Sequence, residues 1–320
     1  LAPAPANHRA WVDLTPEERS VSAREMQVNA GMMEAADYHL GRLLDHLEAI
    51  GALQRTIVMV LSDNGAESAK TSLDGPANLG LDAIKLIEGF DTSFENLGQR
   101  RSLTAVGPEW ASVLSAPFDL YKFYASEGGL RVPLVAAGPG IAASKVEHAP
   151  VHVADLVPTI LEATGVAYDP DQFYGRSALP MLSGNSDTTY KDDESFAFEV
   201  SGNAALYRGK WKITRNTPPQ GDSAWRLYDL SIDPGETMDL LAGNSELFED
   251  MLAEYRSYAR NVGVFEVGPD DYAIKALNKN LLSKVFYNYW PHALGFIIAV
   301  GAALFFTGKF GLALLRRRAL

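Results

Sequence analysis

The chain has 320 residues, of which 47% are hydrophobic, and its formal net charge is −12 at pH 7. This length and apolar content are sufficient for a large packed core and for more than one domain. An acidic chain whose body lacks clustered lysine and arginine is poorly suited to phosphate backbones, which excludes nucleic acid as a partner. The absence of cysteine excludes a disulfide framework, a thiolate metal site and a thiol nucleophile from these residues.

The first predicted element is an amphipathic helix over residues 25–50. Its apolar side chains recur at intervals of three and four residues, the period of one helix face: Met32, Met33, Ala36, Leu40, Leu43, Leu44 and Leu47. Gly51 is expected to end this helix, and the apolar, partly β-branched run over residues 56–61 predicts a buried strand. A helix that leads into a strand is typical of the units that build parallel sheets.

The run Ser62-Asp63-Asn64-Gly65 follows this strand directly. Asp and Asn would bring two oxygen ligands to the edge of a sheet, and oxygen is the donor that Ca²⁺ and Mg²⁺ prefer. Gly65 would let the backbone turn sharply behind them. The pattern therefore indicates Asp63 and Asn64 as candidate metal ligands, with an ordinary turn as the alternative, because these residue types dominate turns.

Residues 66–115 show poor periodicity and are expected to form a long irregular segment, which in a compact domain is usually functional or mobile. A second apolar strand is predicted over residues 132–137, with Gly128 and Gly129 in a tight turn at its entrance. A helix is predicted over residues 155–163. Asp155 would cap its amino terminus and Gly165 its carboxyl end.

The pattern changes from residue 194 onward. Four short aromatic-rich runs predict hairpin strands, over residues 196–200, 205–207, 211–213 and 225–228. An amphipathic helix over residues 245–258 would complete a small α+β subdomain.

The end of the chain is strongly apolar. No formally charged residue occurs between residues 285 and 308, and extension across Lys309 to residue 315 gives a segment long enough to span a bilayer core of roughly 30 Å. The sequence predicts a transmembrane helix over residues 291–315, with a buried core helix as the alternative.

The flanks of this segment indicate its orientation. Tyr287, Tyr289 and Trp290 form an aromatic cluster at its amino-terminal edge, and three arginines lie in the tail over residues 316–320. By the positive-inside rule this tail is cytoplasmic and the globular body lies outside, in the periplasm or the extracellular space.

Several short motifs follow one another in a recognisable order. They are Glu34-Ala35-Ala36-Asp37 with Leu40-Gly41-Arg42-Leu43-Leu44, Ser62-Asp63-Asn64-Gly65-Ala66-Glu67, Tyr121-Lys122 with Glu127-Gly128-Gly129-Leu130-Arg131-Val132-Pro133, His152-Val153-Ala154-Asp155-Leu156-Val157-Pro158-Thr159, and Leu227-Tyr228-Asp229-Leu230 with Asp233-Pro234-Gly235-Glu236. In this order, across about residues 20 to 262, the chain resembles the sulfatase family of the alkaline-phosphatase-like superfamily.

The resemblance implies an α/β fold, in which helices flank a mixed or parallel sheet that is present only in part. Residues 1–190 would be the carboxyl-terminal part of a sulfatase catalytic domain, and residues 191–265 a small subdomain with an antiparallel sheet and a helix. Residues 266–290 would be a juxtamembrane linker that leads to the transmembrane helix.

The resemblance also implies roles for individual residues. Asp63 and Asn64 would help to hold one divalent cation, usually calcium, and Lys122 would contact a small sulfate ester substrate. An ammonium beside the leaving oxygen offsets the negative charge that develops as the S–O bond breaks. Arg131 and Asp37 are expected to be structural. No histidine has the spacing of a metal motif, although His152 lies near the predicted sheet edge.

The chain departs from the family in one respect. Sulfatases carry a formylglycine nucleophile, made from Cys or Ser in a Cys/Ser-X-Pro-X-Arg motif, and two further aspartate ligands, and none of these is found here. Two oxygens are too few for a cation that takes six or more. The expectation is therefore the carboxyl-terminal portion of a membrane-anchored arylsulfatase-type sulfuric ester hydrolase, inactive by itself.

Two alternatives remain open from the sequence. One is a phosphodiesterase or phosphonate monoester hydrolase of the same superfamily, because the same metal edge serves phosphoryl transfer. The other is a non-catalytic, membrane-anchored sulfatase remnant.

Overall fold

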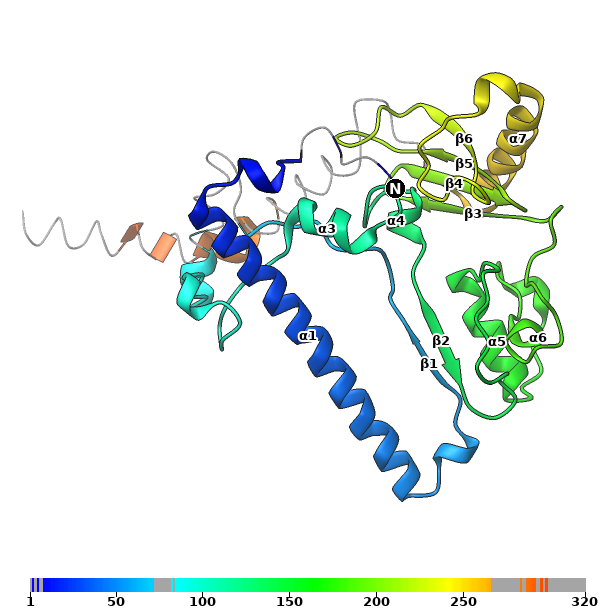
Figure 1. Cartoon of the computed structure of the whole chain (residues 1–320), viewed down its shortest axis with the longest axis horizontal. Helices are drawn as coiled ribbons and strands as arrows, with labels where there is room; N and C mark the ends of the chain where they lie inside the picture. The colour runs from blue at the N-terminus through cyan, green and yellow to red at the C-terminus, as the bar shows by residue number, and fades with distance from the viewer. Residues whose placement is uncertain are drawn as a thin grey trace, which may run out of the picture. The chain divides into compact units, whose positions relative to one another are not determined.

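The computed structural model describes residues 8–71 and 84–265, together with residues 2, 5 and 82 and a few positions between 283 and 298. The chain divides into two compact units, residues 1–265 and 266–320. The first unit carries almost all of the described structure and is drawn in Figure 1. The predicted boundary at residue 190 lies within this unit.

A long helix, α1 (Pro16–Ala49), opens the first unit after the short 3₁₀ turn η1 (Trp11–Asp13). It begins nine residues earlier than predicted, because Thr15 and Glu18 form a capping box and Pro16 occupies the first turn. Gly51 follows its end with a φ of +65°, so the predicted stop is confirmed. No residue of α1 is buried among the described residues.

The strand β1 (Val58–Leu61) follows η2 (Leu53–Arg55) and pairs with β2 (Leu134–Ala137). The pair is antiparallel, with Val58 opposite Ala137 and Leu61 opposite Leu134. The parallel arrangement was therefore the wrong expectation for this pair. A helix followed by a strand does not determine the direction of a partner strand that comes some seventy residues later.

The segment between these strands is more regular than predicted. It contains η3 (Phe94–Asn96), α3 (Gly107–Ser115) and the one-turn helix α4 (Glu127–Leu130). Pro108 in the first turn of α3 favours helix initiation, and Ala111 on its inner face is fully buried. The expectation of irregular structure up to residue 115 was thus wrong for α3.

After β2 come η4 (Val153–Asp155), α5 (Leu156–Ala163), η5 (Pro170–Gln172) and α6 (Leu179–Leu182). Gly165 has a φ of +70° just past α5, as predicted. Asp155 makes no side-chain cap to α5. Its buried carboxylate instead accepts hydrogen bonds from the backbone N–H groups of His152 (2.7 Å) and Arg176 (2.8 Å) and from the hydroxyl of Tyr190 (2.7 Å).

A four-stranded antiparallel sheet lies at the carboxyl end of the first unit. Its strands follow chain order, β3 (Ser195–Val200), β4 (Asn203–Arg208), β5 (Trp211–Arg215) and β6 (Trp225–Asp229). After η6 (Leu241–Gly243), α7 (Ser245–Val262) covers one face of the sheet (Figure 1), and Leu206, Ile213 and Leu227 pack with Met251 of α7 in a common core. The predicted hairpin strands and the helix after them are present, and their separation as a subdomain stays a prediction.

The predicted transmembrane segment over residues 291–315 lies almost entirely outside the described residues. Within the described part of the chain, no helix combines the length and the apolar character needed to cross a bilayer.

Candidate functional site

The first predicted site residues lie in the loop at the carboxyl end of β1. Asp63 is exposed and Asn64 is half-buried. The Asn64 side-chain amide donates from Nδ2 to the Gly65 carbonyl oxygen (2.9 Å), and the Ser62 hydroxyl donates to the Asn64 carbonyl oxygen (2.8 Å). The Asn64 side-chain oxygen takes no part in these bonds. The loop thus presents one carboxylate and one amide oxygen at the end of the strand.

Lys122 is brought to this same loop from a distant part of the sequence. Its backbone N–H donates to the Ala66 carbonyl oxygen (3.1 Å), and its ammonium pairs with the Glu67 carboxylate, with Nζ 2.8 Å from Oε2. The Lys122 side chain is 31% exposed. The structure therefore places the predicted sulfate-contacting lysine against Glu67, which lies in the same loop as the predicted metal ligands.

Three glycines allow this approach of the two segments. The Gly65 N–H donates to the Gly129 carbonyl oxygen (3.0 Å), and a Cβ at Gly65 would lie 1.9 Å from the Gly128 carbonyl oxygen. A Cβ at Gly128 or Gly129 would lie 2.1 Å from a carbonyl oxygen, of Leu120 or Tyr124 respectively. These glycines are required by backbone contact. The expected sharp turns at Gly65, Gly128 and Gly129 are therefore not what excludes a side chain at these positions.

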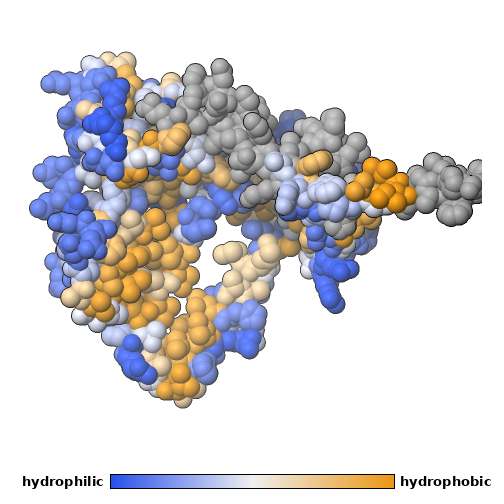
Figure 2. Space-filling view, turned by 180° about the vertical axis from the view of Figure 1, so that it is seen from behind, coloured by the Kyte–Doolittle hydropathy of each residue, from blue (hydrophilic) through white to orange (hydrophobic). Residues whose placement is uncertain are grey.

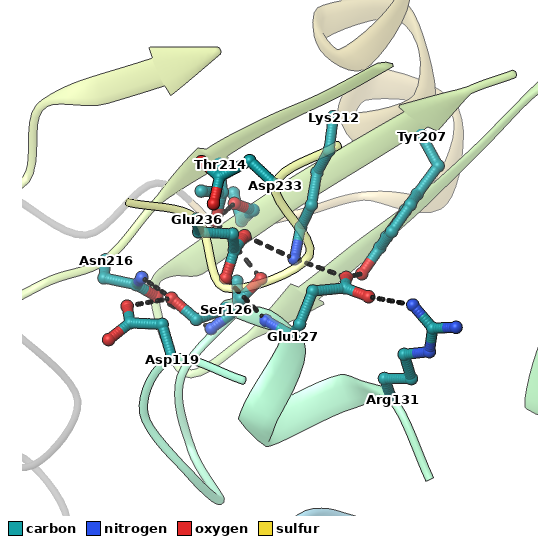
Figure 3. A network of polar contacts seen from close by, with 12 residues as sticks. Asp119, Ser126, Glu127, Arg131, Tyr207, Lys212, Thr214, Asn216, Asp233 and Glu236 are labelled. Atoms are coloured by element: carbon teal, nitrogen blue, oxygen red, sulfur yellow. Dashed lines mark hydrogen bonds and ion pairs between the residues drawn. The ribbon is translucent and has the colours of Figure 1, made fainter. Parts of the chain in front are cut away.

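A buried polar network lies on the other side of α4 (Figure 3). The Lys212 ammonium, on β5, is 2.9 Å from Glu127 Oε1 and 2.8 Å from Glu236 Oε1. Tyr207 donates its hydroxyl to Glu127 Oε1 (2.6 Å), and the Glu127 N–H donates to Glu236 Oε2 (2.7 Å). Arg131 pairs with the other oxygen of Glu127 at 3.5 Å, in keeping with the structural role expected for it.

Charge balance decides the protonation of this network. Burial opposes ionisation of Lys212, Glu127 and Glu236. The two carboxylates nevertheless hold the pKa of Lys212 well above its ordinary value, and Lys212 with Tyr207 lowers the pKa of Glu127. Burial raises the pKa of Glu236 to about 7, against the attraction of Lys212. Lys212 is thus charged, and Glu127 is its ionised partner.

Side chains of the carboxyl-terminal sheet also bind the segment between Lys122 and α4. Asn216 accepts from the Ala125 N–H (2.7 Å) and donates to the Ser126 hydroxyl (2.8 Å). Asn203 donates to the Phe123 carbonyl oxygen (2.6 Å), and Thr214 donates to the Ala125 carbonyl oxygen (3.2 Å). The sheet therefore supports the segment that carries Lys122.

The donor set decides how well a metal ion would fit the loop. Asp63 and Asn64 supply oxygen donors, which suit a hard cation, but such a cation takes six or more. Within the described residues, no group of three His, Asp or Glu side chains is placed to hold a metal ion. The residues present therefore fit only part of a cation site.

The structure shows contacts of His152 and of three charged residues for which the sequence indicated no role. His152, the one histidine singled out, caps η4 by accepting from the Ala154 N–H (2.9 Å) and stacks on Phe198 with ring centroids 4.2 Å apart. Glu67, Lys212 and Glu236 received no role. Lys212 lies between Trp211 and Ile213 in the predicted strand over residues 211–213, which is otherwise apolar. A lysine in such a strand could have been recognised from the sequence as a candidate buried charge.

Comparison with known proteins agrees with these motifs. Residues 3–166, just over half of the chain, match the family model described as sulfatase, and residues 118–257 match the model described as N-sulphoglucosamine sulphohydrolase, C-terminal. An uncharacterized sulfatase of Schizosaccharomyces pombe is 33% identical over 290 residues, which cover 85% of this chain and 50% of that protein. An arylsulfatase of Klebsiella aerogenes is 32% identical over 177 residues, 54% of this chain and 36% of that protein.

Solved structures show the same fold. Ps i-CgsB, solved in complex with k-i-k-neocarrahexaose, superimposes with a TM-score of 0.54 at 21% identity, covering 86% of this chain and 52% of that one. The fold, the ordered motifs and the family models together define a sulfatase-type α/β protein. The chain belongs to the sulfatase family, and it spans half or less of the length of these two curated relatives.

Proposed function

We propose that this chain forms the carboxyl-terminal part of a sulfuric ester hydrolase. Asp63 and Asn64 supply two oxygen ligands of a divalent cation, calcium in the proposal, and Lys122 contacts the sulfate ester. The observation that carries the proposal is the meeting of the Lys122 segment with the Asp63–Asn64 loop, through the 3.1 Å bond from the Lys122 N–H to Ala66 and the ion pair with Glu67.

The chemistry of Lys122 suits this role. Its side chain is partly exposed beside the loop, which leaves access for a substrate, and its ammonium pairs with Glu67. A positive charge aimed at the oxygen that leaves the sulfur stabilises the transition state more than the ground state, because negative charge grows there during cleavage. When bound, the cation would supply further charge stabilisation for the sulfate oxygens.

The proposal includes further polypeptide that completes the site, and the apolar surface of the first unit supports it. Hydrophobic side chains gather over β2 and α5 and at the turn between α1 and β1 (Figure 2). The exposed apolar side chains include Met32, Met33, Leu43, Ile50, Val60, Val135, Val157 and Ile160. A two-stranded sheet with exposed apolar faces is not an independently stable arrangement. The formylglycine nucleophile and the remaining cation ligands belong to this further polypeptide in the proposal.

We also propose that residues 291–315 anchor the protein in a membrane, with the arginine-rich tail in the cytoplasm and the hydrolase unit on the other side. The proposal is supported by the uncharged run between residues 285 and 308 and by the three arginines that follow it.

The experiment is an assay of the protein translated from the genomic sequence that includes the codons upstream of Leu1. We expect that reading frame to encode a Cys/Ser-X-Pro-X-Arg motif and further aspartates. The protein should hydrolyse p-nitrophenyl sulfate in the presence of Ca²⁺, and p-nitrophenyl phosphate much more slowly. Residues 1–320 alone are the matched control and should show no turnover.

Each other result has a defined meaning. Turnover by residues 1–320 alone would contradict the proposal that further polypeptide completes the site. Faster hydrolysis of the phosphate ester would assign the protein to phosphoryl transfer instead. Absence of both activities in the longer protein would refute a hydrolase function and favour the non-catalytic remnant.

A further inference from the structure

We infer that Lys212 is a positioning residue for the site, holding the 122–131 segment against the loop at the end of β1 through Glu127 and Glu236. It contacts neither the loop nor the predicted substrate. The inference rests on the proposed function for the role of Lys122, but the mechanical link that it describes can be measured without catalysis.

The link begins with the placement of charge. Lys212 lies on β5 and is completely buried, and its ammonium faces two carboxylates from different parts of the chain. Glu127 is 85 residues away in sequence and begins α4. A buried ammonium is stable only with such partners. Lys212 therefore ties α4 to the sheet far more specifically than an apolar side chain of the same length would.

The 122–131 segment lies between two supports. Toward the sheet, the Glu127 N–H and carboxylate are bound by Glu236, Lys212 and Tyr207 (Figure 3). Toward β1, the Lys122 N–H and the Gly129 carbonyl oxygen are bonded to Ala66 and Gly65. Displacement of Glu127 would therefore displace the backbone on both sides of it, including Lys122.

The second carboxylate of the network completes the link. Glu236 accepts from the Glu127 N–H while its other oxygen pairs with Lys212, so it joins the backbone of α4 to the strand. Lys212 and Arg131 both pair with the Glu127 carboxylate, and Lys212 also pairs with Glu236. Loss of Lys212 leaves the Glu127 carboxylate buried with fewer partners, and displacement of α4 from the sheet is the change that would relieve this cost.

Hydrogen exchange followed by mass spectrometry tests the link in the longer protein, without any need for substrate. In Lys212→Met, amides of residues 122–130 should exchange at least tenfold faster, while amides of β4, β5 and β6 keep their protection. Lys210→Met is the matched control, because Lys210 lies two residues away, is 53% exposed and pairs with Asp229. It should leave exchange of residues 122–130 unchanged.

A second variant keeps the test decisive if Lys212→Met unfolds. Lys212→Met combined with Glu236→Gln removes the ammonium and one of its two carboxyl partners, so the sheet should stay folded while residues 122–130 still exchange faster than in the control. Equal exchange of residues 122–130 in this double variant and in Lys210→Met would overturn the inference.

Kinetics in the longer protein separate this inference from the proposed function. If Lys212 acts through Lys122, Lys212→Met should lower kcat at least tenfold, and adding it to Lys122→Ala should lower kcat no further. Additive losses, or no loss from Lys212→Met, would overturn the inference alone. A harmless Lys122→Ala would refute the proposed role of Lys122 itself.

Discussion

At the scale of single residues, neighbours in space decide what each side chain does. Lys122 is an unremarkable lysine by its local sequence, yet it pairs with Glu67 beside the candidate metal ligands. Gly65 follows Asp63-Asn64 as many turn glycines do, yet its φ is not positive, and its need for a bare Cα comes from the Gly128 carbonyl oxygen. Both roles depend on contacts with a segment that lies more than fifty residues away.

Replacement of Lys122 tests its catalytic role. In the longer protein, Lys122→Met should lower kcat for an aryl sulfate by about 10²–10³, the usual loss when one preorganised charge-stabilising donor is removed. Lys191→Met, which changes an exposed lysine distant in sequence from the loop, is the control and should retain full activity. Equal rates in the two variants would return Lys122 to a surface role.

Replacement of Gly65 tests the backbone contact. Gly65→Ala should destabilise the chain by about 1–3 kcal/mol in urea unfolding, because a new Cβ would press on a carbonyl oxygen that cannot rotate away. Gly31→Ala is the control, since Gly31 lies within α1 with open space around it, and the change should stabilise by up to about 1 kcal/mol. A neutral Gly65→Ala would contradict the close approach.

Replacement of His152 tests a pH dependence. Burial lowers the pKa of His152 below its ordinary value of 6.5, against the attraction of Asp155. The folded protein therefore binds fewer protons here than the unfolded chain, so this part of the stability is present above pH 6.5 and is lost as the pH falls below it. The Tm of the native chain should fall more between pH 7.5 and pH 5.5 than that of His152→Asn.

The asparagine variant retains an acceptor for the Ala154 N–H but does not titrate. The control is His148→Asn, because His148 is exposed, and its Tm should follow that of the native chain at both pH values. Parallel Tm changes in all three proteins would show that His152 does not contribute to the pH dependence.

At the scale of elements, the local sequence predicts where helices and strands lie better than it predicts how they pair. The strands β3 to β6 were predicted because short aromatic-rich runs between turn residues are typical of hairpin strands. The start of α1 was missed, although Thr15-Pro16-Glu17-Glu18 is a capping signal that could have been found. The direction of β2 relative to β1 had no local signal.

The packing of α7 on the carboxyl-terminal sheet can be measured directly. Met251 on α7 is completely buried in the core with Leu206 and Ile213, so Met251→Ala should destabilise the chain by about 2–5 kcal/mol. Met238→Ala, at a residue that is 62% exposed, should stay within about 0.5 kcal/mol. Chemical denaturation of both variants provides the comparison, and a small effect at Met251 would contradict this core.

At the scale of the whole molecule, both units of the chain carry apolar residues that need a partner outside the unit in the proposal. In the first unit, hydrophobic residues on α1, β1, β2 and α5 are exposed, and the proposal assigns their covering layer to further polypeptide. In the second unit, the apolar segment lies almost entirely outside the described residues, and its role remains a prediction.

Membrane fractionation tests that prediction. The full chain should remain with membranes after alkaline carbonate extraction, whereas a chain ending at Phe265 should be released, since burial of some twenty apolar residues in lipid resists extraction. An epitope after Leu320 should be protected from protease added on the outer side. Release of both chains into the supernatant would contradict the proposed anchor.

The sequence by itself determined the family, the hairpin strands, the strand that precedes Asp63 and Asn64, and the helix ends at Gly51 and Gly165. These features depend on periodicity and backbone preferences within a few residues. Tertiary structure alone decided the antiparallel pairing of β1, the pairing of Lys122 with Glu67 and the burial of Lys212 between Glu127 and Glu236. Such contacts join residues tens of positions apart, and their free energy arises only when packing removes both partners from water.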